Sequence, residues 1–281
     1  MALFFVIVIA LGWAFSAVYN APGVLYFAII FSIAMNFFAY WYSDKIVIKL
    51  AGARPATREE FFNFYTVTEN LCIAAGLPLP RLYVIPDPVP NAFATGRNKE
   101  HAVVAATTGL LSMMDRSELE GVIAHELSHI GNRDILLSTI AVVLVGFITL
   151  LSDMFLRMGI WGGHRDDREG GGQVGAIIMI VGFVLAILAP FAATLTQLAI
   201  SRRREYLADA SGALLTRYPE GLAKALEKIA GHIGPLKKTN NAIAHLYISD
   251  PYGTKKRRSW LNFLQTHPPL QERIHLLREM K

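Results

Sequence analysis

Charged side chains and cysteine are both scarce in this chain of 281 residues. Only 17% of the residues are charged, against about 25% in an average globular protein, and 53% are hydrophobic, so much of the chain faces something other than water. The single cysteine, Cys72, excludes an intramolecular disulfide and a zinc site built from several thiolates. Any bound metal must therefore be held by His, Asp or Glu.

Four uncharged, apolar segments account for the low charge content. Each is close to the roughly 17–25 residues that a helix needs to span a bilayer. The segments are Leu3–Val18, Val24–Trp41, Ile135–Ser152 and Gly175–Ile200. A turn-forming cluster at 19–23 separates the first two and predicts a helical hairpin. A buried core helix is the alternative for each run, but four runs in so short a chain favour four transmembrane helices.

The distribution of Lys and Arg predicts the orientation of these helices. Basic residues such as Lys45, Lys49 and Arg202 follow the second and fourth segments, and cytoplasmic loops carry such residues in excess. We therefore expect a multi-pass protein of the cell membrane with two cytoplasmic parts. The predicted regions are a transmembrane hairpin (1–41), a first cytoplasmic part (42–134), the third and fourth spanning helices (135–200) with an extracytoplasmic loop near 157–174, and a second cytoplasmic part (201–281).

The cytoplasmic parts combine helices with short strands. Predicted helices are Thr57–Ala75, which ends at Gly76, a helix opened by a Ser117–Glu120 capping box, and Glu205–Ala230. Predicted strands are Arg81–Ile85, Asn91–Gly96 and Ala102–Thr107, the last two joined by a polar turn. The expected fold class is α+β, mainly helical, with a small β-sheet. We find no nucleic-acid-binding motif.

An H-E-x-x-H motif at 125–129 carries the clearest chemical signal. On a helix, positions i and i+4 share one face, so the imidazoles of His125 and His129 can bind one metal ion. Glu126 is placed to hold a water molecule and take its proton, as a general base does beside zinc. Two surface histidines on a helix are the alternative.

A third protein ligand is needed, because catalytic zinc usually has three. Glu205 is the candidate, with Asp209 four residues on and able to orient a ligand histidine. His129 lies six residues before the third apolar segment and Glu205 five after the fourth. Both would therefore stand roughly 8–9 Å from the same membrane face. Ordinary solvent-facing charges are the alternative for these two carboxylates.

A strand edge is the predicted site of substrate binding. An exposed edge can pair its backbone with an extended peptide. The candidate has small side chains at two positions and no proline to remove a donor. Its residues are Asn91, Ala92, Phe93, Ala94 and Thr95. An inner strand of the sheet is the alternative.

Together these features resemble the HtpX family of membrane zinc proteases, relatives of the type I CAAX prenyl proteases. The matching segments are H-E-x-x-H at 125–129, E-x-x-x-D at 205–209, N-A-F-A-T-G at 91–96 and T-H-P-P at 266–269. The resemblance implies a gluzincin-type protease domain in the cytoplasm, one zinc ion per chain and endopeptidase activity. It also implies a role in stress-related quality control, with misfolded membrane proteins as substrates.

The resemblance further implies a role for each matching residue. His125, His129 and Glu205 would bind zinc, Glu126 would be the general base, and Asp209 would orient a ligand. By the same resemblance, His267 would approach the active site and stabilise the oxyanion, although a His-Pro turn is often purely structural.

Three other functions compete with this interpretation. A CAAX-type enzyme that processes prenylated proteins is one, and a zinc-binding scaffold without activity is another. A transporter or channel would carry ionisable residues within the membrane, and the four apolar segments have none.

The predicted orientation can be tested with single cysteines. In a Cys72→Ala background, a cysteine at Gly163 should react with a membrane-impermeant thiol reagent on intact cells, whereas one at Lys99 should not, because only the first faces outward. Labelling at 99 alone would invert the topology. Labelling at neither would mean that the third and fourth segments do not fully span.

Overall fold

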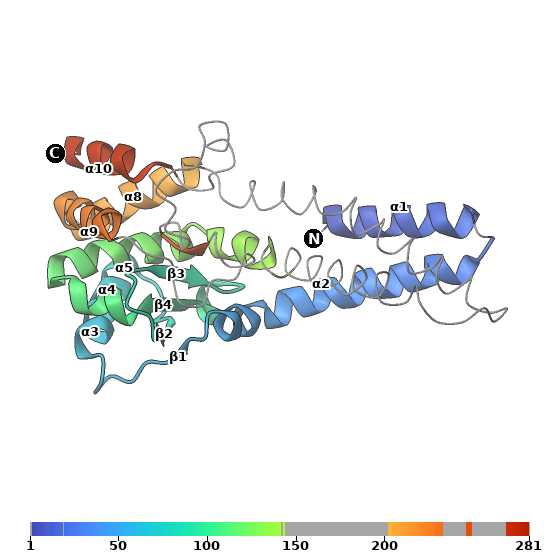
Figure 1. Cartoon of the computed structure of the whole chain (residues 1–281), viewed down its shortest axis with the longest axis horizontal. Coiled ribbons are helices and arrows are strands. Elements are labelled where there is room, and N and C mark those ends of the chain that lie inside the picture. Colours follow the sequence, from blue (N-terminus) through green and yellow to red (C-terminus); the bar gives the residue numbers. More distant parts are fainter. Residues whose placement is uncertain are drawn as a thin grey trace, which may run out of the picture. The chain divides into compact units, whose positions relative to one another are not determined.

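The computed structural model of the chain describes residues 2–18, 20–141, 143, 202–232, 246–248 and 268–280 (Figure 1). The fourth apolar segment, most of the third, the loop near 157–174 and His267 lie outside the described residues. The chain divides into two compact units, Met1–Ser43 with Val143–Leu195 and Asp44–Val142 with Thr196–Lys281. Each unit is described by itself.

The first unit contains α1 (Ala2–Val18) and most of α2 (Pro22–Leu50). The chain turns between them at Asn20, whose φ is 49°, as the predicted hairpin requires. The two helices approach closely, because a Cβ on Gly12 would lie only 2.4 Å from the Cβ of Ala28.

Helix α2 is, among the described residues, the one helix long and apolar enough by length and composition to cross a membrane. Its outward side chains include Phe27, Ile30 and Phe37, each more than half exposed. The helix includes the whole apolar segment Val24–Trp41 and continues beyond it to Leu50. Of the four predicted spans, the other three stay predictions.

The second unit is built around a four-stranded mixed sheet with the strand order β1-β2-β4-β3. Strand β2 pairs with β4 in parallel, and the other neighbours are antiparallel. The strands are β1 (Arg54–Pro55), β2 (Arg81–Ile85), β3 (Ala92–Thr95) and β4 (Val103–Thr107). The three predicted strands are confirmed, β2 with the predicted bounds and β3 and β4 with slightly shorter ones, whereas β1, with two residues, was not predicted.

The two faces of the sheet pack against different parts of the unit. Val84, Ala94 and Val104 contribute to the main core, together with residues of the helices. On the opposite face, Phe93 and Ala105 belong to a smaller cluster that also contains Val47 and Ala51, at the end of α2. This second contact explains why α2 extends past its apolar part.

The helices of this unit are α3 (Phe62–Ala75), α4 (Thr108–Met113), α5 (Arg116–Gly131), α8 (Arg202–Thr216), α9 (Pro219–Gly231) and α10 (Leu270–Glu279), with a short 3₁₀-helix η1 (Lys99–His101). Residues 134–141 are also helical. Helix α5 is central, since it contacts α3, α8, α9 and β3. This mainly helical architecture with a small sheet agrees with the expected fold class.

Helix boundaries differ from the predictions at the start of α3 and within the predicted helix Glu205–Ala230. Helix α3 starts at Phe62, after a turn, although it ends at Gly76 in the left-handed conformation as predicted (φ 63°). The single helix predicted over Glu205–Ala230 is wrong, because Pro219 starts a new helix after Arg217, whose φ is 52°.

The predicted Ser117–Glu120 capping box is also wrong. Asp115 caps α5, accepting a hydrogen bond from the Glu118 backbone N–H at 2.9 Å, while Glu118 accepts one from the Asp115 N–H at 2.8 Å. Ser117 donates to the Asp115 carboxylate at 2.8 Å, and Glu120 pairs with Arg116. An aspartate two residues earlier thus supplies the same reciprocal pattern.

The position of this cap can be tested by comparing two substitutions. Asp115→Ala should lower the free energy of unfolding by about 1 kcal/mol, because it removes a side-chain cap from a helix N-terminus. Ser117→Ala should cost less than about 0.5 kcal/mol, as a surface substitution does. Melting of the purified variants in detergent gives both values. Equal losses would contradict this assignment of the cap.

Candidate metal centre

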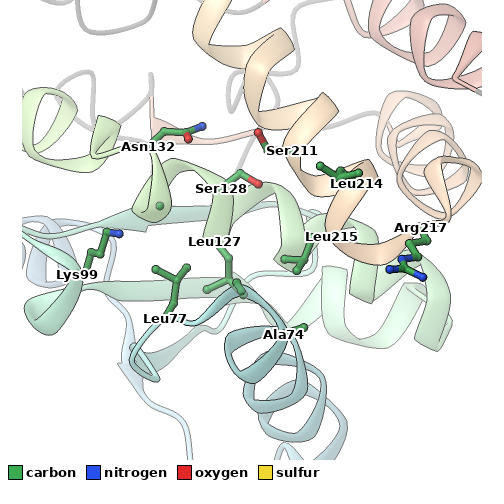
Figure 2. A pocket seen from close by; sticks show the side chains of 12 residues that line it. Ala74, Leu77, Lys99, Leu127, Ser128, Asn132, Ser211, Leu214, Leu215 and Arg217 are labelled. Carbon is green, nitrogen blue, oxygen red and sulfur yellow. The ribbon is translucent and has the colours of Figure 1, made fainter.

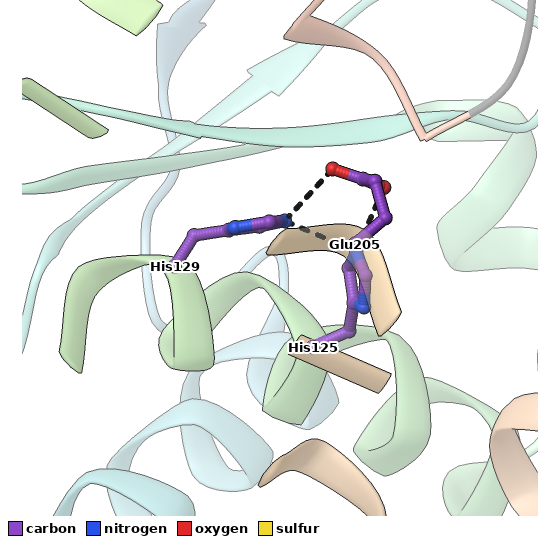
Figure 3. A group of neighbouring side chains, drawn as sticks. All are labelled: His125, His129 and Glu205. Atoms are coloured by element: carbon purple, nitrogen blue, oxygen red, sulfur yellow. Dashed lines mark hydrogen bonds and ion pairs between the residues drawn. The ribbon is translucent and has the colours of Figure 1, made fainter. Parts of the chain in front are cut away.

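Three side chains from two helices converge inside the second unit (Figure 3). His125 and His129 lie one turn apart on α5, and Glu205 lies in the first turn of α8. The Nε2 atoms of the two histidines are 3.2 Å apart. The Glu205 carboxylate lies 3.5 Å from His129 Nε2 and 3.8 Å from His125 Nε2. His125 and Glu205 are buried, and His129 is partly buried.

The spacing of these donor atoms suits a metal ion. Ligands about 2.0–2.1 Å from a tetrahedral zinc ion lie roughly 3.3 Å from one another. The distances of 3.2 and 3.5 Å match that edge length, and 3.8 Å is slightly longer. Two imidazoles and one carboxylate are also the donor set of known catalytic zinc sites, in which a further position stays open for water. The residues therefore fit zinc in both chemistry and spacing.

Close packing of α8 on α5 produces this convergence. Gly212, on the same face of α8 as Glu205, lies against the backbone at His125, where an added Cβ would be 3.0 Å from the His125 nitrogen. A larger residue at this point would push the two helices apart. Glycine therefore allows the carboxylate of α8 to reach the histidines of α5.

Glu126 is buried in the same region and is not one of the three clustered donors. Burial raises the pKa of its carboxyl, even though His125 and His129 act in the opposite direction. A carboxylate with a raised pKa is a better acceptor for the proton of a water molecule near neutral pH. Its placement thus suits a general base.

Each histidine has a carboxylate on its other ring nitrogen. Asp209 lies 2.9 Å from His125 Nδ1, and Asp134 lies 3.3 Å from His129 Nδ1. Such partners fix the ring orientation and leave Nε2 directed at the metal position. The sequence predicted a role for Asp209 but not for Asp134, which follows α5 after a short turn.

These contacts also shift the pKa values of Asp209 and His129. Burial alone would raise the pKa of the Asp209 carboxyl, but Arg273 and His125 together hold it below its ordinary value. Burial disfavours the charged form of His129, yet the hydrogen bond with Asp134 and the charge of Glu205 raise its pKa to about 9.

Arg273 is a residue of the site that the sequence did not reveal. It comes from α10, is fully buried and donates to both oxygens of Asp209. A signal was present in the pattern of α10, where Leu270, Ile274 and Leu277 form an apolar face that also includes Arg273. A charged residue on such a face needs a buried partner.

Strand β3 lies at one edge of the sheet among the described residues. Asn91 and Thr107 are joined by backbone and side-chain hydrogen bonds on the β4 side. By the alternation of an antiparallel ladder, the N–H and C=O of Ala92 and Ala94 then point to the other side. There the Ala92 carbonyl accepts a hydrogen bond from the Ile248 N–H at 3.1 Å, and the Ala92 N–H donates to the side-chain oxygen of Asn91.

Within the described part of the chain, the backbone of Ala94 has no hydrogen-bond partner on this outer side. Beyond it, the Gly96 N–H donates to the Thr139 hydroxyl at 3.2 Å. Counting the described residues alone, the outer edge of β3 is therefore hydrogen-bonded near both ends but not at Ala94, whose side chain is buried.

A pocket of about 770 Å³ lies between the end of α3, α5 and α8 (Figure 2). Its walls include Leu77, Leu127 and Leu215, with Lys99 and Arg217 as the basic residues. None of the three clustered donors lines it, and neither do Glu126 and Asp209. It is therefore distinct from the metal centre, although both use α5 and α8.

Comparison with protein-family models matches residues 60–281 to Peptidase family M48. This range includes every residue of the centre described above.

Curated relatives named "Protease HtpX homolog" match the chain over most of its length. The protein of Caldanaerobacter subterraneus subsp. tengcongensis is 44% identical over 283 residues, which cover 100% of this chain and 93% of the relative. That of Dictyoglomus thermophilum is 50% identical and covers 88% and 78%, and that of Pyrococcus furiosus is 47% identical and covers 93% and 88%.

Among solved structures, the crystal structure of S. mikatae Ste24p is similar, with a TM-score of 0.55 and 18% identity. The alignment covers 96% of this chain and 62% of that protein, so the chain spans less than two thirds of its length. At this identity the likeness concerns the fold alone.

Proposed function

The chain belongs to peptidase family M48 and is a membrane metalloprotease, and we propose that it hydrolyses internal peptide bonds with one zinc ion held by His125, His129 and Glu205. One observation carries the proposal. The three donors converge from α5 and α8 with the buried carboxylate of Glu126 next to the first of them. Zinc, when bound, would act as a Lewis acid that polarises the substrate carbonyl and lowers the pKa of water.

In the proposed reaction, Glu126 moves the proton. Its carboxylate takes a proton from the attacking water, whose oxygen forms the new bond to the carbonyl carbon. The same proton then passes to the nitrogen of the leaving amine as the C–N bond breaks. The raised pKa of Glu126 supports this role, because the carboxyl must hold the proton between the two events.

Asp209 keeps the proton of His125 on Nδ1, so that Nε2 presents its lone pair to the metal. His267, which lies outside the described residues, is proposed to donate a hydrogen bond to the developing oxyanion. The resemblance of the T-H-P-P segment at 266–269 to the family supports this role.

We further propose that substrate binds along the outer edge of β3, over Asn91–Thr95. The outward N–H and C=O of Ala94, which have no hydrogen-bond partner among the described residues, can pair with one residue of an extended peptide. Main-chain pairing gives affinity without recognition of side chains, which suits an enzyme with many substrates. Substrate that extends toward Ala92 would compete with Ile248 for the Ala92 carbonyl.

The biological setting that we propose is quality control of misfolded or damaged membrane proteins. The apolar α2, the predicted further spans and the Lys/Arg distribution support a multi-pass protein whose gluzincin-type active site faces the cytoplasm. The proposed regions of this protein are 1–41, 42–134, 135–200 and 201–281. No observation favours prenylated substrates, because the likeness to Ste24p concerns the fold alone.

The chemical roles can be tested with two substitutions. Glu126→Gln should retain zinc but lower kcat about 10²–10⁴-fold, because a carboxamide cannot take the proton of water. Glu205→Ala should instead lose zinc during dialysis against a weak chelator. Metal analysis and cleavage of an unfolded protein measure the two effects. Wild-type cleavage by Glu126→Gln would show that the proposed base is wrong.

The substrate edge can be tested at Ala94. Ala94→Pro removes the outward N–H while leaving the ladder with β4, so kcat/KM for a peptide should fall about tenfold or more through KM. Ala94→Gly is the matched control, because it keeps the N–H, and it should stay near wild type. Zinc content should not change in either variant. Normal proteolysis by a folded Ala94→Pro protein would exclude this edge as the binding site.

A further inference from the structure

We propose that Arg273 is a positioning residue of the metal centre, which holds Asp209 and, through it, the His125 ring in the geometry that binds metal. This inference rests on the proposed zinc site and adds to it a residue from a third helix. Arg273 touches neither the proposed substrate edge nor Glu126 in any contact of the described residues. It therefore acts through other groups.

The guanidinium makes a two-point contact with one carboxylate. Its Nε donates to Asp209 Oδ2 at 2.8 Å, and its Nη2 donates to Asp209 Oδ1 at 2.7 Å. The planar fork of arginine matches a carboxylate in this way, and the pair of bonds fixes the carboxylate plane. A single contact would leave Asp209 free to rotate about its side-chain bonds.

The orientation of Asp209 in turn determines that of His125. Asp209 Oδ1 accepts from Arg273 and also lies 2.9 Å from His125 Nδ1. With the proton of His125 on Nδ1, the ring turns Nε2 toward His129 and Glu205. The Nη2 atom of Arg273 also lies 3.4 Å from His125 Nδ1. With the proton on Nδ1, both nitrogens are donors and do not hydrogen-bond to each other, so Asp209 is the group that connects Arg273 to His125.

The charge of Arg273 also matters inside this cluster. Three buried carboxylates lie close together, those of Glu126, Glu205 and Asp209. Among the described residues, Arg273 is the one Lys or Arg that is buried, and its Nη1 lies 3.7 Å from Glu205. It therefore offsets part of the negative charge of this cluster, chiefly that of Asp209 and to a smaller extent that of Glu205.

A role of Arg273 in offsetting charge and a role in positioning Asp209 predict different effects of Arg273→Lys. Lys keeps the positive charge but offers a point donor in place of the planar fork. If Arg273 served only to offset charge, Arg273→Lys would bind zinc as the wild type does. If it positions Asp209, Arg273→Lys should weaken zinc binding within the 10–100-fold range typical of groups that orient a metal ligand.

The experiment measures zinc affinity of the full-length protein in detergent, by competition with a chromophoric chelator. Arg273→Lys should bind zinc at least tenfold more weakly and shift the visible spectrum of the Co²⁺-loaded protein. Arg278→Lys is the matched control, because Arg278 lies on the same helix but is exposed and pairs with Glu220 and Glu227. It should change neither measurement.

A double-mutant cycle tests whether Arg273 acts through Asp209. In an Asp209→Asn background, Arg273→Lys should weaken zinc binding by less than about twofold, since the carboxylate that it positions is gone. The same loss in both backgrounds would overturn the proposal, as would wild-type affinity in Arg273→Lys.

Failure of folding can be distinguished from failure of the proposal. Melting of the metal-free variants reports folding, and if Arg273→Lys does not fold, Asp209→Asn alone must weaken zinc binding at least tenfold. Wild-type affinity in Asp209→Asn would then overturn the inference. Absence of zinc binding by the wild type would instead reject the proposed function itself.

Discussion

The close approach of α8 to α5 is the constraint on which the metal centre depends. Gly212 lies against the backbone at His125, and Glu205 lies two turns earlier on the same face of α8. Asp209, between them, reaches the outer nitrogen of the His125 ring. One contact between two helix backbones thus sets the distances from both carboxylates to the histidines. The sheet, α9 and α10 pack around this pair.

The part of the site that sequence could predict is the part encoded within single helical turns. His125 and His129 share a face because they are four residues apart, and the same holds for Glu205 and Asp209. Arg273 could not be predicted in this way, since 64 residues separate it from Asp209 and 148 from His125. Only packing of α10 brings these groups together, and the pattern of α10 indicates a buried charge without naming its partner.

The fold shows the same division between local and long-range information. Alternating and β-branched residues predicted the three longer strands, whereas β1 exists only because two residues pair with β2. The break at Pro219 and the cap at Asp115 are local signals that were available. The break was overlooked, and the cap was assigned to Ser117. The end of α2 depended on packing against Phe93, which hydropathy does not report.

The position of Arg273 in the chain has a consequence for synthesis. Ribosomes make the chain from the N-terminus, so the H-E-x-x-H helix emerges long before α10 does. Until residue 273 has been added, Asp209 lacks the cation that it pairs with in the finished fold, and buried carboxylates without such a partner are costly. The centre therefore matures late.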